Sequence, residues 1–232
     1  MKGNSKGKII VIEGTDCSGK ETQTSLLVQR LKKEGRKIER LSFPMYDTPT
    51  GKIVGGCLLG KQYICDGFFP EGAGNVDAKV ASLYYAADRK YNVKLITDLL
   101  DNGTDVILDR YVESNMGCQG GKIFDKEERL KLYKDLDQIE YDFLELPRPD
   151  LTIFLYMPSD KVFELKKGRL EPGDQAENNP IYIKNAEKAY LELAKLHNYK
   201  TIKCIDTKKK LRDIESIHED VYKVVCKELG VK

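Results

Sequence analysis

The sequence predicts a doubly wound α/β fold, in which a five-stranded parallel sheet carries helices on both faces. Its short apolar runs are continuous, whereas a half-exposed sheet would alternate apolar and polar residues. Continuous runs are typical of parallel strands that are covered on both faces. Stretches with helical spacing separate the runs, and this repeated order of strand and helix favours a parallel sheet.

Five apolar runs form the predicted strands in chain order. They are residues 9–13, 38–43, 106–109, 151–157 and 201–206. The second run alternates more than the others, which indicates that it is less completely buried. Because the carboxyl ends of parallel strands are where open α/β sheets bind ligands, the residues just after each run are the first candidates for a site.

Four stretches between the runs have the spacing of amphipathic helices. Residues 22–33 stop before Gly35, residues 76–100 form a long helix, and residues 127–146 end at LPRP, where the prolines forbid continuation. Residues 211–225 form the closing helix. Residues 61–75 and 168–180 fit neither pattern, and loops of such length are uncommon unless they are functional, so we expect residues 168–180 to be a lid.

Composition predicts a single globular domain over residues 1–232. The hydrophobic fraction is 41% and the charged fraction 33%, the balance of a soluble protein. A net charge of +2 argues against capture of nucleic acid or acidic membranes. Neither a secretion signal nor a membrane-spanning run is visible. Six scattered cysteines without a C-x-x-C pair indicate reduced thiols, and we expect a cytoplasmic protein.

The stretch GTDCSGKETQ, which begins at Gly14, has the context of a phosphate-binding P-loop. It follows a predicted strand and opens a predicted helix. Gly14 and Gly19 let the backbone turn its N–H groups inward as an anion nest, and the helix adds the positive end of its dipole. Lys20 would then reach the β- and γ-phosphates of a nucleotide.

Glu21 stands where a P-loop normally has a Ser or Thr that holds Mg²⁺. Three interpretations stay open. Its carboxylate is itself a magnesium ligand, directly or through water. Alternatively, Thr22 supplies the hydroxyl, to a phosphate. Otherwise the metal is held poorly and catalysis is impaired.

Five segments in one order identify a family. GTDCSGKETQ, SFPMYDTPTGK, YYAADRK, LDRYVESN and PDLTIFLYMPSDKVFELKKGR together resemble the thymidylate kinase family of nucleoside monophosphate kinases, over residues 8–196. The resemblance implies transfer of a phosphoryl group from ATP to dTMP, with Mg²⁺ as cofactor and a homodimer as the assembly. It assigns ATP binding to the nine loop residues Gly14, Thr15, Asp16, Cys17, Ser18, Gly19, Lys20, Glu21 and Thr22.

The same resemblance implies roles for residues at the acceptor sugar and phosphate. Asp16 would accept a hydrogen bond from the 3′-hydroxyl, and Tyr111 would crowd a ribose 2′-hydroxyl. Phe43 and Pro44 match a Phe-Pro element at the end of the second strand. Tyr46 stands where related enzymes often have an arginine for the acceptor phosphate, so Arg110 is expected to carry more of that contact.

At the base, the family pattern implies that Tyr85 stacks on thymine and that Arg89 hydrogen-bonds O4, since the two lie one helical turn apart. Ser114, Asn115 and Gln119 would contact the base edge. Asp109 would hold Mg²⁺. These assignments describe a site for dTMP beside the nucleotide loop.

Family members place a catalytic arginine either in the P-loop or in the lid. The P-loop position is Cys17 here, so Arg169 in the predicted lid is the expected source. Lys20, Arg110, Arg169 and Mg²⁺ would surround the transferred phosphoryl group. No general base is required, because the dTMP phosphate is already an anion. Two alternatives are a kinase of another deoxynucleotide such as dUMP, and a non-catalytic nucleotide-binding relative.

Overall fold

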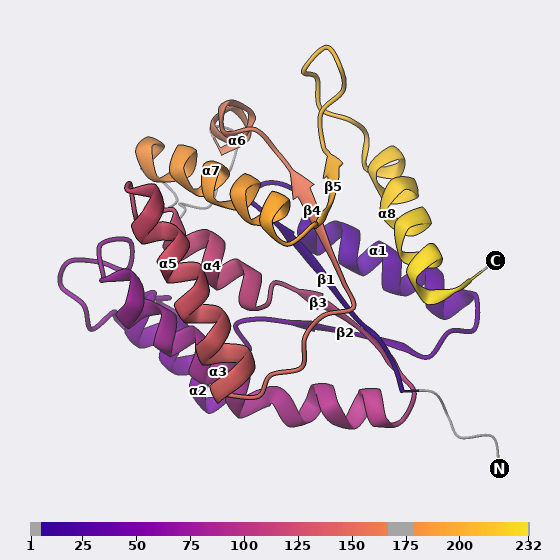
Figure 1. Ribbon diagram of the computed structural model, residues 1–232, viewed down its shortest axis with the longest axis horizontal. Helices are drawn as coiled ribbons and strands as arrows, with labels where there is room; N and C mark the ends of the chain where they lie inside the picture. Colours follow the sequence, from indigo (N-terminus) through magenta and orange to yellow (C-terminus); the bar gives the residue numbers. More distant parts are fainter. Residues whose placement is uncertain (1–5, 167–178, 232) are drawn as a thin grey trace.

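Five parallel strands form the centre of the computed structural model, which describes residues 6–166 and 179–231 (Figure 1). The strands are β1 (Ile9–Gly14), β2 (Ile38–Ser42), β3 (Asp105–Asp109), β4 (Leu151–Tyr156) and β5 (Lys200–Lys203). They lie side by side in the order β2-β3-β1-β4-β5, and all four neighbouring pairs are parallel. The predicted five-stranded parallel sheet is confirmed.

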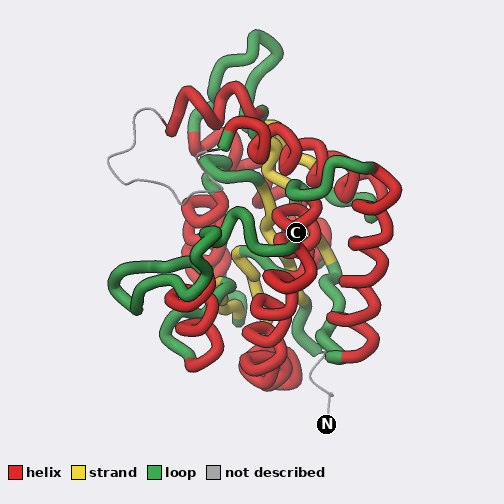
Figure 2. Tube along the Cα trace, turned by 90° about the vertical axis from the view of Figure 1, so that its left-hand side faces the viewer, coloured by secondary structure: helices red, strands yellow, loops and turns green. Residues whose placement is uncertain are grey.

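Helices cover both faces of this sheet, and Figure 2 shows the strands between them. Helices α1 (Lys20–Lys33) and α8 (Ile214–Leu229) pack on one face. The opposite face carries α3 (Ala78–Asp101), α4 (Val112–Gly120), α5 (Lys126–Asp137) and α7 (Pro180–Leu196). Shorter elements are α2 (Pro49–Lys52), α6 (Ser159–Lys166) and the π-helical segments η1 (Ile53–Leu58) and η2 (Gln138–Phe143).

The central strand β1 explains why its run is apolar throughout. Ile9 and Val11 belong to the hydrophobic cluster under α3 and α4, whereas Ile10 and Ile12 belong to the cluster under α1 and α8. Since successive side chains of a strand point to opposite faces, a strand covered on both faces needs apolar residues at every position.

Helix α4 was absent from the predicted helices because its residues are mostly small or polar. Its sequence VESNMGCQG lacks the apolar spacing of an amphipathic helix. The helix is nevertheless buried, since it packs against β1, α3, α5 and α7. A Cβ at Gly117 would lie 2.5 Å from Tyr190 Cζ, so the glycine permits this close approach.

Helices α1 and α3 begin within two residues of their predicted starts, and the other two predicted helices differ more. The predicted helix 127–146 is α5 followed by η2, where the wider π-helical turn changes which side chains face inward. The closing helix begins at Ile214 and not at residue 211, because Asp213 caps it by accepting a hydrogen bond from the Ser216 N–H.

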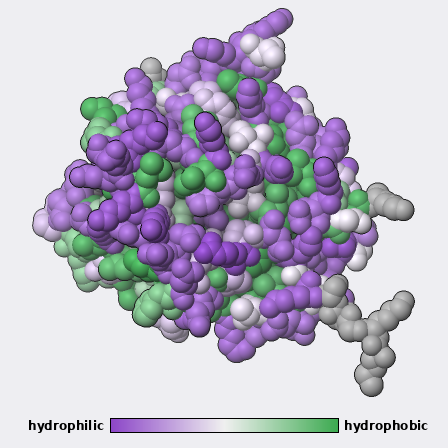
Figure 3. Space-filling model, in the orientation of Figure 1, coloured by the Kyte–Doolittle hydropathy of each residue, from purple (hydrophilic) through white to green (hydrophobic). Residues whose placement is uncertain are grey.

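Most of the predicted lid, residues 168–180, lies outside the described residues, and so does Arg169. Its last two residues are described: Asn179 caps α7, and Pro180 is the first residue of that helix. Within the described part, no helix is long and apolar enough to cross a membrane. In the view of Figure 3, hydrophilic side chains cover much of the surface and apolar ones form separate patches between them.

Candidate active site

The P-loop joins the end of β1 to the start of α1, as the sequence predicts. Cys17 and Gly19 both have left-handed backbone conformations, with φ of 58° and 80°. Left-handed residues in such a loop turn successive N–H groups to one side, which makes an anion-binding concavity. Gly14 has no room for a side chain, since a Cβ there would meet Ser18 Oγ and lie 2.7 Å from the Leu155 carbonyl oxygen. The loop therefore has the geometry of a phosphate cradle.

Lys20 is folded onto this loop and is buried. Its ammonium group donates hydrogen bonds of 2.9 Å to the carbonyl oxygens of Gly14 and Thr15. Burial, together with the positive charge of Arg110, lowers the pKa of Lys20 from its ordinary value. An ammonium group has three donors, so one stays available for an anion in the loop. Ser18 Oγ is also buried and has no hydrogen-bond partner among the described residues.

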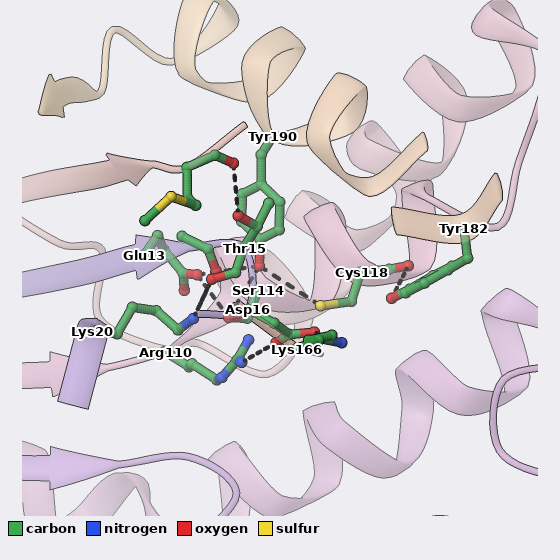
Figure 4. Close-up of polar contacts among 12 residues, drawn as sticks. Glu13, Thr15, Asp16, Lys20, Arg110, Ser114, Cys118, Lys166, Tyr182 and Tyr190 are labelled. Carbon is green, nitrogen blue, oxygen red and sulfur yellow. Dashed lines mark hydrogen bonds and ion pairs between the residues drawn. The ribbon is translucent and has the colours of Figure 1, made fainter. Parts of the chain in front are cut away.

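Asp16 and Arg110 form an ion pair at the junction between the P-loop and the end of β3 (Figure 4). Arg110 Nη2 lies 3.2 Å from Asp16 Oδ1, and Lys166 Nζ at the end of α6 lies 3.5 Å from the other carboxylate oxygen. Burial alone would raise the pKa of Asp16, but the charges of Arg110, Lys20 and Lys166 outweigh it and hold the pKa below its ordinary value. Asp16 is thus an acceptor within a cationic site.

Arg110 has an unusual backbone conformation, with φ of 68°. Left-handed geometry is disfavoured for a residue with a side chain, and it is found mostly where the surroundings enforce it at functional sites. Here the chain turns from β3 into α4 immediately after Asp109, so the turn directs the guanidinium group toward Asp16. The strand end and the turn together fix the position of this cation.

Glu13 is a fully buried carboxylate directly before the loop, and sequence analysis did not assign it a role. It accepts hydrogen bonds from the Tyr111 N–H at 3.0 Å, from Ser114 Oγ at 2.7 Å and from the Tyr190 hydroxyl at 3.3 Å. Tyr111 lies in the turn after β3. Ser114 belongs to α4 and Tyr190 to α7 (Figure 4). The sequence did contain an indication of such a role, because Glu13 is the one charged residue in the otherwise apolar run IIVIEG.

Asp109, predicted to hold Mg²⁺, ends β3 beside the P-loop and is almost completely buried. Its Oδ2 accepts a hydrogen bond of 2.7 Å from Arg40 Nη2, a contact that the sequence did not indicate. The described residues contain no cluster of three or more metal-ligating side chains. Mg²⁺ at phosphate sites usually takes only one or two carboxylates, with water and substrate phosphates as its other ligands. Asp109, next to a phosphate cradle, fits that donor set.

One pocket adjoins the P-loop, and every residue predicted to bind the acceptor lines it. These residues are Asp16, Phe43, Pro44, Tyr46, Tyr85, Arg89, Arg110, Tyr111, Ser114, Asn115 and Gln119. They come from the ends of β1, β2 and β3 and from α3 and α4, and the fold brings them together. Their individual contacts with a substrate stay predictions.

The deep end of the pocket is formed by α3 and α4. Tyr85 is half-buried against the small cluster of Leu58, Val76 and Ala81. Arg89 is buried, and its guanidinium group forms a two-pronged ion pair with Glu140 of η2. Asn115 Oδ1 and Gln119 Oε1 are buried there without a hydrogen-bond partner among the described residues. Polar groups that are buried without partners usually await water or a ligand.

The predicted crowding residue Tyr111 is a buried part of the pocket wall. Its hydroxyl donates a hydrogen bond of 3.2 Å to the Pro147 carbonyl oxygen, and its ring packs against that of Phe43 at 5.9 Å between centroids. Both ends of the side chain are therefore fixed. A rigid wall of this kind can exclude a group by its shape.

Residues 61–75, whose contribution the sequence left open, form part of the same pocket. Ala73 and Gly74 line it, together with Leu58 and Leu59 of the preceding segment. Lys61 Nζ lies 4.9 Å from the centre of the Tyr46 ring, which is a cation–π contact at the position where related enzymes often have an arginine. Lys122 and Tyr182 also line the pocket and were missed, since neither lies in a segment that carries the family pattern.

Comparisons with known proteins agree with this geometry. Residues 12–221 match the sequence model of the thymidylate kinase family. Human thymidylate kinase is 29% identical over 216 residues, which are 93% of this chain and 88% of the human protein. Thymidylate kinase from Halothermothrix orenii is 30% identical over 222 residues, 94% of this chain and 95% of that protein.

The fold points to the same relatives. A solved structure of thymidylate kinase from Candida albicans superposes with a TM-score of 0.70 at 25% identity, and the match covers 98% of this chain and 94% of that one. The sequence match and the structural match both extend over nearly the whole chain. This chain therefore belongs to the thymidylate kinase family.

Proposed function

We propose that the protein transfers the γ-phosphoryl group of ATP to dTMP and thereby forms ADP and dTDP. The observation that carries the proposal is the Asp16–Arg110 pair, because it borders both the P-loop and the acceptor pocket. A group placed there contacts a donor phosphate and an acceptor phosphate at once. The two substrates can then be held in line, which is most of what phosphoryl transfer requires.

The reaction forms a bond between a phosphate oxygen of dTMP and the γ-phosphorus, and it breaks the bond from that phosphorus to the oxygen that bridges it to the β-phosphate. Lys20 and Arg110 supply positive charge on either side of the transferred group. Their charges would stabilise the negative charge of the transition state, in a buried site where electrostatic interactions are strong. The dTMP phosphate is an anion already, so the site needs no general base.

Mg²⁺ is part of the proposal. When bound, it would neutralise charge on the β- and γ-phosphates of ATP. Asp109 would hold it, directly or through water, and Glu21 in the first turn of α1 is the second candidate ligand. The arginine expected from the lid, Arg169, lies outside the described residues and stays a prediction. Lys166 at the end of α6 is a described cation that contacts Asp16.

Two further parts of the proposal concern the whole protein. We expect a homodimer, since the exposed side of α3 carries a line of apolar side chains, namely Val80, Leu83, Tyr91 and Leu95. We also expect a cytoplasmic location, since none of the six cysteines, all of which are described, forms a disulfide.

The direct test measures ADP release with ATP, Mg²⁺ and a panel of nucleoside monophosphates. We expect dTMP to be the best acceptor, with dUMP next. A higher kcat/KM for a different deoxynucleotide would identify another kinase. ATP binding without turnover on any acceptor would indicate a non-catalytic relative.

Two variants connect this activity to the site. Lys20→Ala and Arg110→Ala should each lower kcat by roughly 10³-fold or more while the protein stays folded. Lys32→Ala on the exposed side of α1 and the exposed Arg148→Ala are the matched controls and should retain activity. Near-native turnover in either site variant would contradict the assignment.

A further inference from the structure

Glu140 lies behind the base end of the pocket, where it is completely buried in η2. Its two carboxylate oxygens accept hydrogen bonds from Arg89 and from Asn115. Both of these residues line the pocket, whereas Glu140 does not. One buried carboxylate therefore holds two side chains that face a bound base.

The ion pair with Arg89 fixes the plane of the guanidinium group. Arg89 Nε donates to Glu140 Oε2, and Arg89 Nη2 donates to Oε1 at 2.6 Å. Such a two-pronged arrangement leaves the guanidinium no freedom to rotate. The remaining nitrogen, Nη1, donates a long hydrogen bond of 3.4 Å to the Tyr111 carbonyl oxygen and has a second N–H. Arg89 thus offers a fixed donor.

The contact with Asn115 fixes which atom of its amide faces the pocket. Asn115 Nδ2 donates to Glu140 Oε1 at 2.9 Å and to the Ser82 carbonyl oxygen at 3.1 Å. Both partners only accept hydrogen bonds, so the NH₂ group must face them and use both of its hydrogens. Asn115 Oδ1 then points the other way, and it is buried with no hydrogen-bond partner among the described residues. Asn115 thus offers a fixed acceptor.

We propose that Glu140 is a positioning residue that sets base selectivity, by fixing a donor on Arg89 beside an acceptor on Asn115. This inference rests on the proposed function and deepens it. Thymine and uracil present a carbonyl oxygen next to a ring N–H, which complements that pair. Cytosine presents an amino group next to an unprotonated ring nitrogen. Its amino group would face the donor on Arg89, and its ring nitrogen would face the acceptor on Asn115. Glu140 therefore selects keto pyrimidines without touching them.

Glu140→Gln tests the proposal because it keeps the shape and removes the charge. A glutamine has one acceptor oxygen and one NH₂ group, so it cannot accept from Arg89 Nε, Arg89 Nη2 and Asn115 Nδ2 together. At least one donor must turn away, and the Asn115 amide becomes able to present its NH₂ group to the pocket. We expect kcat/KM for dTMP to fall by about 10²-fold, and the dTMP preference over dCMP to fall by at least about tenfold. The KM for ATP should stay within twofold.

The chain contains a matched control. Arg129 of α5 and Glu192 of α7 form the same two-pronged ion pair, with distances of 2.7 Å and 2.8 Å, and neither residue lines the pocket. Glu192→Gln removes the same type of contact from the same type of partner. It should lower the melting temperature without changing the ratio of dTMP to dCMP turnover.

Two measurements decide the outcome, namely calorimetric binding and ADP release. Calorimetric titration of the folded variants with dTMP and with dCMP gives the ratio of the two dissociation constants, even in the absence of turnover. An unchanged ratio in Glu140→Gln would overturn the role of Glu140, whereas lack of dTMP-dependent ADP release by the wild-type enzyme would overturn the proposed function. If Glu140→Gln does not fold, Glu140→Asp keeps the charge but is too short for both contacts, and an unchanged ratio in that variant overturns the proposal equally.

Discussion

Three buried carboxylates lie at the first turn of α4, and each has a different set of partners. They are Glu113 in that turn, and Glu13 and Glu140, which contact Ser114 and Asn115. Glu13 accepts three hydrogen bonds, and Glu140 is paired with Arg89. Glu113 Oε1 accepts a hydrogen bond of 2.9 Å from the Tyr141 hydroxyl. Its other oxygen has no partner among the described residues. A buried carboxylate with so little support favours its protonated form.

We predict that Glu113→Gln stabilises the protein at alkaline pH. Burial first, and then the charge of Glu13, raise the pKa of Glu113 from 4.5 to about 7. The unfolded chain therefore loses this proton at a lower pH than the folded chain does. Between these two pKa values the folded state binds more protons, so the contribution of Glu113 to the free energy of unfolding falls as pH rises, by about 3 kcal/mol.

Thermal melts at pH 4.5 and pH 8 check this. Glutamine keeps an acceptor for Tyr141 and carries no charge, so the variant should melt several degrees above wild type at pH 8 and close to wild type at pH 4.5. The exposed Glu127→Gln on α5 should show no such difference. An equal shift at both pH values would mean that Glu113 ionises with an ordinary pKa.

The P-loop glutamate gives a second prediction at this scale. Glu21 is exposed in the first turn of α1, directly after Lys20. If its carboxylate holds Mg²⁺ through water, Glu21→Ala should raise the Mg²⁺ concentration for half-maximal rate by about tenfold, and Glu21→Ser should restore it. A Mg²⁺ titration of all three proteins at saturating ATP measures this. If neither variant changes the Mg²⁺ concentration for half-maximal rate, Glu21 is not a ligand and only interacts favourably with the dipole of α1.

At the scale of elements, Lys122 joins α4 to residues 61–75. Its ammonium group donates hydrogen bonds of 3.1 Å and 2.9 Å to the carbonyl oxygens of Ala73 and Val76. Ala73 and Gly74 line the acceptor pocket, so this contact holds one wall of the pocket in place. The segment has no regular helix or strand between η1 and α3. Its position therefore depends on such contacts.

We predict that Lys122→Met raises the KM for dTMP and leaves the KM for ATP unchanged. Methionine keeps the length of the chain and removes the donors, and one hydrogen bond contributes about 0.5–1.5 kcal/mol, so a rise of roughly 3- to 10-fold is expected. Hydrogen exchange of residues 61–75 should become faster in the variant. If hydrogen exchange of residues 61–75 is unchanged, the rise in KM for dTMP comes from the lost positive charge and not from movement of this segment. Lys131→Met on the exposed side of α5 is the control.

The prediction of elements from sequence succeeded where burial leaves a local pattern. Strands β1, β3 and β4 were found because both of their faces are covered, and α1 and α3 because one face is apolar. Helix α4 was missed, although it carries Ser114, Asn115 and Gln119, because it packs by small residues and polar contacts. Helix α7 was missed because its first residue, Pro180, had been assigned to the predicted lid.

At the scale of the whole molecule, the parallel topology explains why so much of the site could be predicted. The order β2-β3-β1-β4-β5 places the carboxyl ends of β1, β2 and β3 side by side, so Asp16, Pro44 and Arg110 converge. The contacts of Arg40 with Asp109 and of Glu140 with Arg89 could not be predicted. Each joins residues far apart in sequence, and neither Arg40 nor Glu140 lies in a motif.

The exposed side of α3 leads to the prediction for the assembly. Val80, Leu83, Tyr91 and Leu95 recur at helical spacing on a face that the described residues leave exposed. Apolar lines of this kind on a surface helix mark contact sites between proteins. We expect two copies of the chain to meet there, so the protein should sediment at twice its mass of 26.4 kDa.

Leu83→Glu should convert this dimer to a monomer. A C₂ interface uses the same surface of both copies, so the substitution would bury two unpaired carboxylates. Sedimentation velocity at micromolar concentration measures the change. Leu191→Glu, on the exposed side of α7, is the matched control and should stay dimeric. A wild-type protein that sediments as a monomer would contradict the predicted dimer, whereas a Leu83→Glu variant that stays dimeric would place the interface elsewhere. Since Tyr85 and Arg89 lie on the same helix, monomeric Leu83→Glu should also show a raised KM for dTMP.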